Sequence, residues 1–132
     1  MSHDSVYRIS THALLDDTLD DSNLAAELQF VGHKPMSDGI ELLKDNTVVI
    51  TDVENGGIGL LSPAGEYTSL TKSNDVDWAD SVTVAPDGSI WFTDSRLTAL
   101  IDQFAIPSDQ STMMSEGPYP IYRVPASAYT MD

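Results

Sequence analysis

Two stretches of the chain, DGIELLKDNTVVITD at residues 38–52 and DSVTVAPDGSIWFTD at residues 80–94, follow one pattern at a constant offset of 42 residues. An aspartate opens each copy, a second lies at its centre, and Thr-Asp closes it. The runs before the closing pair are β-branched and aromatic, as strands usually are. Asp45-Asn46 and Asp87-Gly88 tolerate positive φ, so each copy is expected to form a strand, a two-residue turn and a second strand.

A repeat of about 40 residues built from hairpins is typical of β-propellers, in which each blade is a sheet of four strands. After the first copy, further strands are expected at 57–62 and 67–71, which would complete a full blade at 38–73. After the second copy, a third strand is expected at 121–124, within a partial blade at 80–125.

The N-terminal residues fit the same pattern. VYRI at 6–9 is similar to IYRV at 121–124, which predicts another third strand. Residues 27–31 alternate between apolar and polar side chains, as a fourth strand would. Strands of one further blade are therefore expected within 6–33.

A short helical segment is expected between these two N-terminal strands. Leucines recur at roughly helical spacing within 12–26, and Asp20-Asp21-Ser22 is a typical helix start. The predicted fold class for 1–132 is therefore all-β: a single partial β-propeller domain of about two blades, with four-stranded antiparallel sheets and this short helical segment.

The composition excludes several classes of function. Lys and Arg number 6 against 21 Asp and Glu, so the net charge of −15 argues against binding nucleic acid or anionic membranes and fits attraction of cations. The chain has no cysteine, which excludes disulfides, thiolate nucleophiles and cysteine-ligated metals. It shows no apolar run of 18 residues and no signal peptide, so a cytoplasmic location is expected.

Five motifs occur in order between residues 6 and 125 and point to a family. They are KPMSDGI (34–40), ITDVEN (50–55), DWADS (77–81), APDGSIWFTD (85–94) and PYPIYRV (118–124). This series resembles the C-terminal part of bacterial members of the yellow / major royal jelly protein family. That family is related to the gluconolactonase-like six-bladed propellers, and this chain corresponds to less than half of such a ring.

The resemblance implies a metal site. In the related lactonases, the position before the first strand of a blade supplies Asn or Asp ligands to a divalent cation, which points to Asp38 and Asp80 here. Carboxylate oxygens suit calcium or magnesium. The alternative is that each aspartate caps a loop or accepts hydrogen bonds from backbone amides between blades.

Three further residues are candidate ligand contacts, and none is assigned a catalytic role. Trp78 stands two residues before Asp80 and is expected either to wall a channel pocket or to pack between blades. His33 precedes the first repeat and is expected at the channel mouth or on a surface loop. Glu54 follows the first Thr-Asp pair on an exposed loop. The recurring Thr-Asp pairs themselves are expected to be structural.

An open arc of blades exposes apolar faces and unpaired strand edges at both ends. Self-association is expected to cover these faces and edges. The blade count predicts a trimer, and the general frequency of oligomers favours a dimer. The alternative is a monomer that covers its own ends with residues 12–26 and 95–118.

These observations lead to one function hypothesis with two alternatives. The first is a self-associating propeller fragment that binds a small molecule or a divalent cation near its channel-facing aspartates. The second is a metal-dependent lactonase-type hydrolase, in which a cation polarises a lactone carbonyl and activates water. The third is an inactive remnant of a larger propeller protein.

Overall fold

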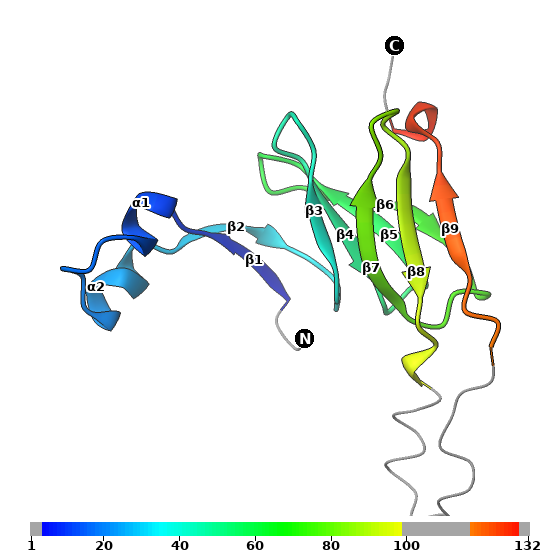
Figure 1. The fold of residues 1–132 in the computed structure, drawn as a ribbon, viewed down its shortest axis with the longest axis horizontal. Coiled ribbons are helices and arrows are strands. Elements are labelled where there is room, and N and C mark those ends of the chain that lie inside the picture. Colours follow the sequence, from blue (N-terminus) through cyan, green and yellow to red (C-terminus); the bar gives the residue numbers. More distant parts are fainter. Residues whose placement is uncertain (1–3, 99–116, 130–132) are drawn as a thin grey trace, which may run out of the picture.

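The computed structural model describes residues 4–98 and 117–129. In these ranges nine strands form three antiparallel sheets, with the strands of each sheet adjacent in chain order (Figure 1). The elements are β1 (Ser5–Arg8), α1 (Thr11–Leu14), α2 (Asp21–Ala26), β2 (Gln29–His33), β3 (Ile40–Leu42), β4 (Val48–Asp52), β5 (Gly57–Leu61), β6 (Tyr67–Lys72), β7 (Ala79–Val84), β8 (Ile90–Asp94), β9 (Ile121–Val124) and the 3₁₀ turn η2 (Ala126–Ala128).

The helical segment near the N-terminus consists of two short helices rather than one. Each begins at a side chain that accepts a hydrogen bond from the first turn: the Ser10 hydroxyl from the amide of Ala13 at 3.0 Å, and the Asp20 carboxylate from the amide of Asn23 at 2.8 Å. The helix start predicted at Asp20 is confirmed. No helix in the described part of the chain is long and apolar enough to cross a bilayer.

The two repeats form the hairpins β3–β4 and β7–β8, but their turns are one residue longer than predicted. The residues that flank the loops 44–46 and 86–88 are joined by a backbone hydrogen bond of 2.8 Å in both cases. Asn46 and Gly88 have φ of 67° and 79° and occupy the third loop position. A three-residue loop needs a left-handed residue there, so a residue that tolerates positive φ does not by itself specify a two-residue turn. The loop 63–65 between β5 and β6 follows the same scheme.

The core lies between the second and third sheets, where β7 packs against β3 and β4. The Phe92 ring of β8 stacks on the Tyr122 ring of β9, with centroids 5.1 Å apart. Burial of such side chains contributes about 1.5–3 kcal/mol each. The buried apolar cluster comprises Val49, Ile58, Val76, Ala79, Ile90, Phe92 and Val124.

The N-terminal hairpin β1–β2 lies beside the second sheet and extends away from it (Figure 1). The hairpin approaches the β5–β6 loop closely: a Cβ on Gly32 would stand 2.6 Å from the carbonyl oxygen of Gly65 and 2.9 Å from Cδ1 of Leu61. Among the described residues β1 pairs with β2 alone, so its other edge is open. Close by, the residues Ile40 and Leu42 on β3 are 60% and 57% exposed.

Candidate functional site

The aspartates of the Thr-Asp pairs at the ends of β4 and β8 are buried, with Asp52 0% and Asp94 1% exposed. Thr51 is also buried, and Thr93 is half-buried. The Asp94 carboxylate accepts hydrogen bonds from the amides of Asp77 at 3.1 Å, Trp78 at 2.9 Å and Arg96 at 2.9 Å. These bonds fix the segment that leads into β7. The structural role predicted for this aspartate is confirmed.

Asp52, the counterpart of Asp94, serves different donors. It accepts hydrogen bonds from the amide and side chain of Asn55 at 2.9–3.0 Å and from the Tyr67 hydroxyl at 3.0 Å. Burial, followed by the hydrogen bond and charge of Asp52, raises the pKa of Tyr67 far above its ordinary value. The phenol therefore stays protonated and remains a donor to the buried carboxylate.

Glu54, rather than Asp52, accepts a backbone amide from the segment before β3, as Asp94 does for the segment before β7. Met36 stands at the repeat position of Trp78, and its amide donates to Glu54 Oε2 at 2.9 Å. Pro35 stands at the repeat position of Asp77 and has no N–H to offer. Glu54 is exposed, and its observed contact holds the chain in front of β3.

We call β3 and β7, the first strands of the second and third sheets, the inner strands. The threonine of each pair fixes the start of the inner strand beside it. Thr51 Oγ1 accepts the amides of Asp38 at 3.0 Å and Gly39 at 2.9 Å. In the third sheet, Thr93 Oγ1 accepts the amide of Ser81 at 3.2 Å. The two hydroxyls hold both inner strands, β3 and β7, at equivalent points.

Asp38 and Asp80 lie at the same end of these two adjacent inner strands. The buried Trp78 ring donates its Nε1–H to Asp38 Oδ2 at 2.9 Å, which bridges two repeats. A Cβ on Gly39 would stand 2.4 Å from the Asp80 carbonyl oxygen, so the two backbones nearly touch. Asp38 is exposed and Asp80 half-buried, with the Ser81 hydroxyl 3.2 Å from Asp80 Oδ1. We call Asp38, Trp78 and Asp80 the acidic end.

Asp80 does not precede its strand as predicted. The strand β7 begins at Ala79, and the pairing with β8 shifts between Ala79 and Val82. This irregularity places Asp80 inside the strand, whereas Asp38 stands two residues ahead of β3. The equivalence of the two aspartates in sequence is therefore approximate in space.

His33 belongs to the N-terminal hairpin. Its Nδ1 is 3.4 Å from the Ser5 hydroxyl and 3.9 Å from an Asp4 carboxylate oxygen, and its ring meets the Phe30 ring edge-on at 5.1 Å. The side chain is 75% exposed. These contacts place it at the end of β2 rather than in the hydrogen-bonded group at the acidic end.

Ser95, which the sequence did not indicate, contacts the backbone of Trp78 in the acidic end. The Ser95 hydroxyl is buried and has no hydrogen-bond partner among residues 4–98 and 117–129, while the Ser95 amide donates to the Trp78 carbonyl at 3.0 Å. No repeat or motif singles out this serine, because its surroundings are created by folding.

Within the described part of the chain, the donor set for a cation is incomplete. In residues 4–98 and 117–129, no three His, Asp or Glu side chains converge as a metal site. Calcium takes six to eight oxygen ligands and magnesium takes six. Asp38 and Asp80 are of the right chemical type, but further ligands would have to come from elsewhere.

The comparisons with known proteins support the fold. No family model matches the chain, and no curated protein matches it. A solved structure described as "the putative gluconolactonase in protein family" matches at 21% identity with a TM-score of 0.56. The match covers 79% of this chain and 36% of that one, so the chain spans about a third of its length. The resemblance to the yellow / major royal jelly protein family stays a prediction, whereas the predicted all-β, gluconolactonase-like partial propeller is confirmed.

Proposed function

We propose that the chain is a self-associating propeller fragment that binds a divalent cation, or a small polar ligand, at its acidic end. The observation that carries this proposal is the position of Asp38 and Asp80 at one end of the adjacent strands β3 and β7, with the Trp78 ring hydrogen-bonded to Asp38. Carboxylate oxygens are the ligands that calcium and magnesium prefer. A net charge of −15 raises the local concentration of such cations.

Self-association would add ligands to the two carboxylates that the described residues of one chain bring to this end. Two carboxylates hold a hard cation weakly, but a ring of copies would bring several acidic ends to one channel mouth. Three copies complete six blades if each contributes two, which makes the trimer the preferred assembly and the dimer the second. Cation binding and assembly are therefore expected to depend on one another.

The test is thermal unfolding with calcium, magnesium, manganese or zinc. We expect the first two to raise the Tm of the wild type, since a ligand at one hundred times its Kd adds about 2.7 kcal/mol. The double variant Asp38→Asn with Asp80→Asn should lose this shift, because an amide keeps the acceptor for Trp78 but not the charge. Asp17→Asn, an exposed aspartate far along the chain, is the control. An undiminished shift in the double variant would mean that cations bind elsewhere on the acidic surface.

Lactone hydrolysis is the second candidate, and the fold likeness to a gluconolactonase-described structure favours it. A divalent cation held by Asp38 and Asp80 would supply a Lewis acid for the lactone carbonyl. The assay is hydrolysis of glucono-δ-lactone with each cation, compared with a metal-free blank and with the double variant. A cation-dependent Tm shift without hydrolysis would support binding alone, and the absence of both would favour an inactive remnant.

A further inference from the structure

Two strands from opposite ends of the chain carry nearly the same sequence. The first is Val6-Tyr7-Arg8-Ile9, whose first three residues belong to β1. The second is Ile121-Tyr122-Arg123-Val124, which is the whole of β9. Both have a central Tyr-Arg pair between aliphatic residues. In the structure, β9 lies on the edge of β8, while β1 has one open edge among the described strands.

The edge of β8 is matched to a Tyr-Arg strand. Tyr122 stacks on Phe92 with ring centroids 5.1 Å apart. The Arg123 guanidinium lies 5.8 Å from the centre of the Trp91 ring, and its Nη2 is 3.2 Å from Asp87 Oδ2. Three residues on β8 and its loop therefore recognise two consecutive residues of β9.

Among the described residues, the equivalent positions of β1 have no stacked ring and no acidic partner. Tyr7 is 56% exposed and meets the edge of the Phe30 ring, at 5.8 Å between centroids. Arg8 is exposed and donates from Nε to Gln29 Oε1 at 3.0 Å, within its own hairpin. In the described register Gln29 is the cross-strand partner of Arg8. The partner of Arg123 is Trp91, and Asp87 of the adjoining loop adds an ion pair to it.

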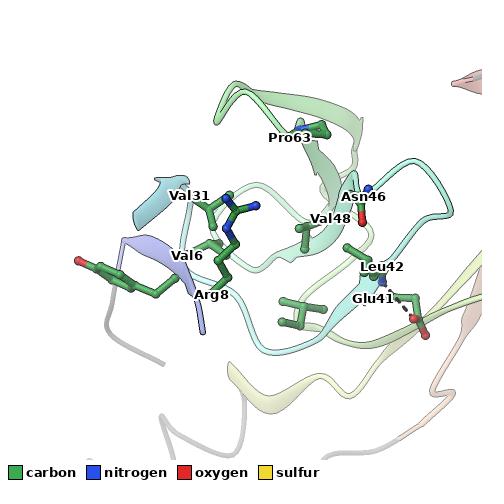
Figure 2. A pocket seen from close by; sticks show the side chains of 10 residues that line it. Val6, Arg8, Val31, Glu41, Leu42, Asn46, Val48 and Pro63 are labelled. Atoms are coloured by element: carbon green, nitrogen blue, oxygen red, sulfur yellow. Dashed lines mark hydrogen bonds between the residues drawn. The ribbon is translucent and has the colours of Figure 1, made fainter. Parts of the chain in front are cut away.

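A groove lies between β1–β2 and the second sheet and has a volume of about 450 Å³. Figure 2 shows Val6, Arg8 and Val31 on one side of it and Leu42 and Val48 on the other. On the opposite face of β3 and β4, the inner strand β7 of the next blade covers the sheet. If the blades repeat in the same way on this side, the first two strands of a preceding blade would fill this groove.

We propose that β1 of one copy replaces β9 on the β8 edge of a second copy. The hairpin β7–β8 of that copy then occupies the groove of the first, and β7–β8–β1–β2 becomes a four-stranded blade. Tyr7 takes the place of Tyr122 on Phe92, and Arg8 takes the place of Arg123 beside Asp87. This proposal rests on the self-association in the proposed function and names its contact.

The exchange is head-to-tail, so it continues until a ring closes. Each copy contributes β1 to β8, which is two blades, and the displaced β9 is left over. Because β9 is tethered to β8, it competes with an effective concentration on the order of millimolar. The added burial of Ile40 and Leu42 under the incoming hairpin favours the exchanged state. Assembly should therefore depend on protein concentration.

Engineered cysteine pairs test the exchange, because the chain has no cysteine of its own. Thr93 pairs directly with Ile121 across β8 and β9, and Val6 is the counterpart of Ile121. Thr93→Cys with Val6→Cys should form disulfides between copies, seen as a ladder on a non-reducing gel. Thr93→Cys with Ile121→Cys should lock β9 in place, giving particles of 14.3 kDa by light scattering.

A second pair of variants applies one substitution to equivalent residues. Arg8→Glu places an acid opposite Asp87 only in the exchanged state, so it should lower the mass at a given concentration. Arg123→Glu weakens only the resident strand, so it should raise the mass. Equal effects of the two variants would overturn the exchange.

The outcomes separate this proposal from the proposed function. Suppose that the wild type has the mass of an oligomer, that the variant with the β8–β9 disulfide keeps that mass, and that residues 6 and 93 give no cross-link. In that case the copies associate through another surface. That result sinks the exchange and leaves self-association standing. A wild type of 14.3 kDa up to about millimolar concentration overturns both the exchange and the self-association.

Discussion

Replacement of Asp94 should destabilise the segment that carries Trp78. It should lower the free energy of unfolding more than a substitution of an exposed residue does. The buried carboxylate accepts three backbone amides, two at Oδ1 and one at Oδ2. A hydrogen bond to a charged group is worth about 1.5–3 kcal/mol, and such contributions are not additive. We expect Asp94→Ala to cost about 4 kcal/mol, a large share of the 5–15 kcal/mol typical of a domain.

Asp94→Asn should cost about half as much, roughly 2 kcal/mol. The amide oxygen can still accept the amides of Trp78 and Arg96, but the new NH₂ group would face the amide of Asp77. The two variants therefore predict a graded series that follows the number of donors lost.

Urea unfolding followed by circular dichroism measures the series. With a slope of about 2 kcal/mol per molar, Asp94→Ala should lower the midpoint by about 2 M. Asp17→Asn, which removes the same charge from an exposed site, should leave the midpoint unchanged within about 0.3 M. A loss below about 1 kcal/mol in Asp94→Ala would refute the assignment of this carboxylate as the anchor of the segment.

Three further changes test other parts of the structure. Gly39→Ala should destabilise by at least about 2 kcal/mol in thermal unfolding, since its Cβ would stand 2.4 Å from a backbone oxygen. Gly117→Ala should cost far less stability, because its Cβ would stand 3.4 Å from the nearest atom, in the Tyr119 ring. Ser95→Ala should raise the urea midpoint, because an unpartnered buried hydroxyl costs about 1 kcal/mol or more. The hydroxyl and amide of Ser89 lower the pKa of Asp87, so its contribution to stability is complete above about pH 4 and is lost as the pH falls further. Asp87→Asn should therefore show a smaller fall in Tm than the wild type between pH 5 and 3, and an equal fall would contradict this reasoning.

The hairpins of both repeats were predictable because their signals are local. Asp45 and Asp87 accept the amides two residues ahead, Thr47 and Ser89, at 3.0 and 2.9 Å, as aspartate does in turns of many proteins. The loop length was not predictable in this way. A left-handed residue such as Asn46 is compatible with two-residue and three-residue loops, and the strand register decides between them.

The acidic end was only partly predictable. Sequence order placed Asp38 and Asp80 at the inner strands, but spacing carried no sign of the Trp78 hydrogen bond, because its repeat counterpart Met36 has no such group. The expectation for His33 rests on its closeness in sequence to the first repeat. The pairing of β1 with β2 decides its position instead and puts it beside Ser5.

The two buried aspartates that end β4 and β8 have a consequence for building chimeras from this chain. Asp94 depends on amides from the segment before its blade, whereas Asp52 depends on Asn55 and Tyr67 inside its own blade. Grafting the connecting segment of one blade onto the other would bury a carboxylate without donors. Modules of this chain that look interchangeable in an alignment can therefore be exchanged only together with the residues that satisfy their aspartate.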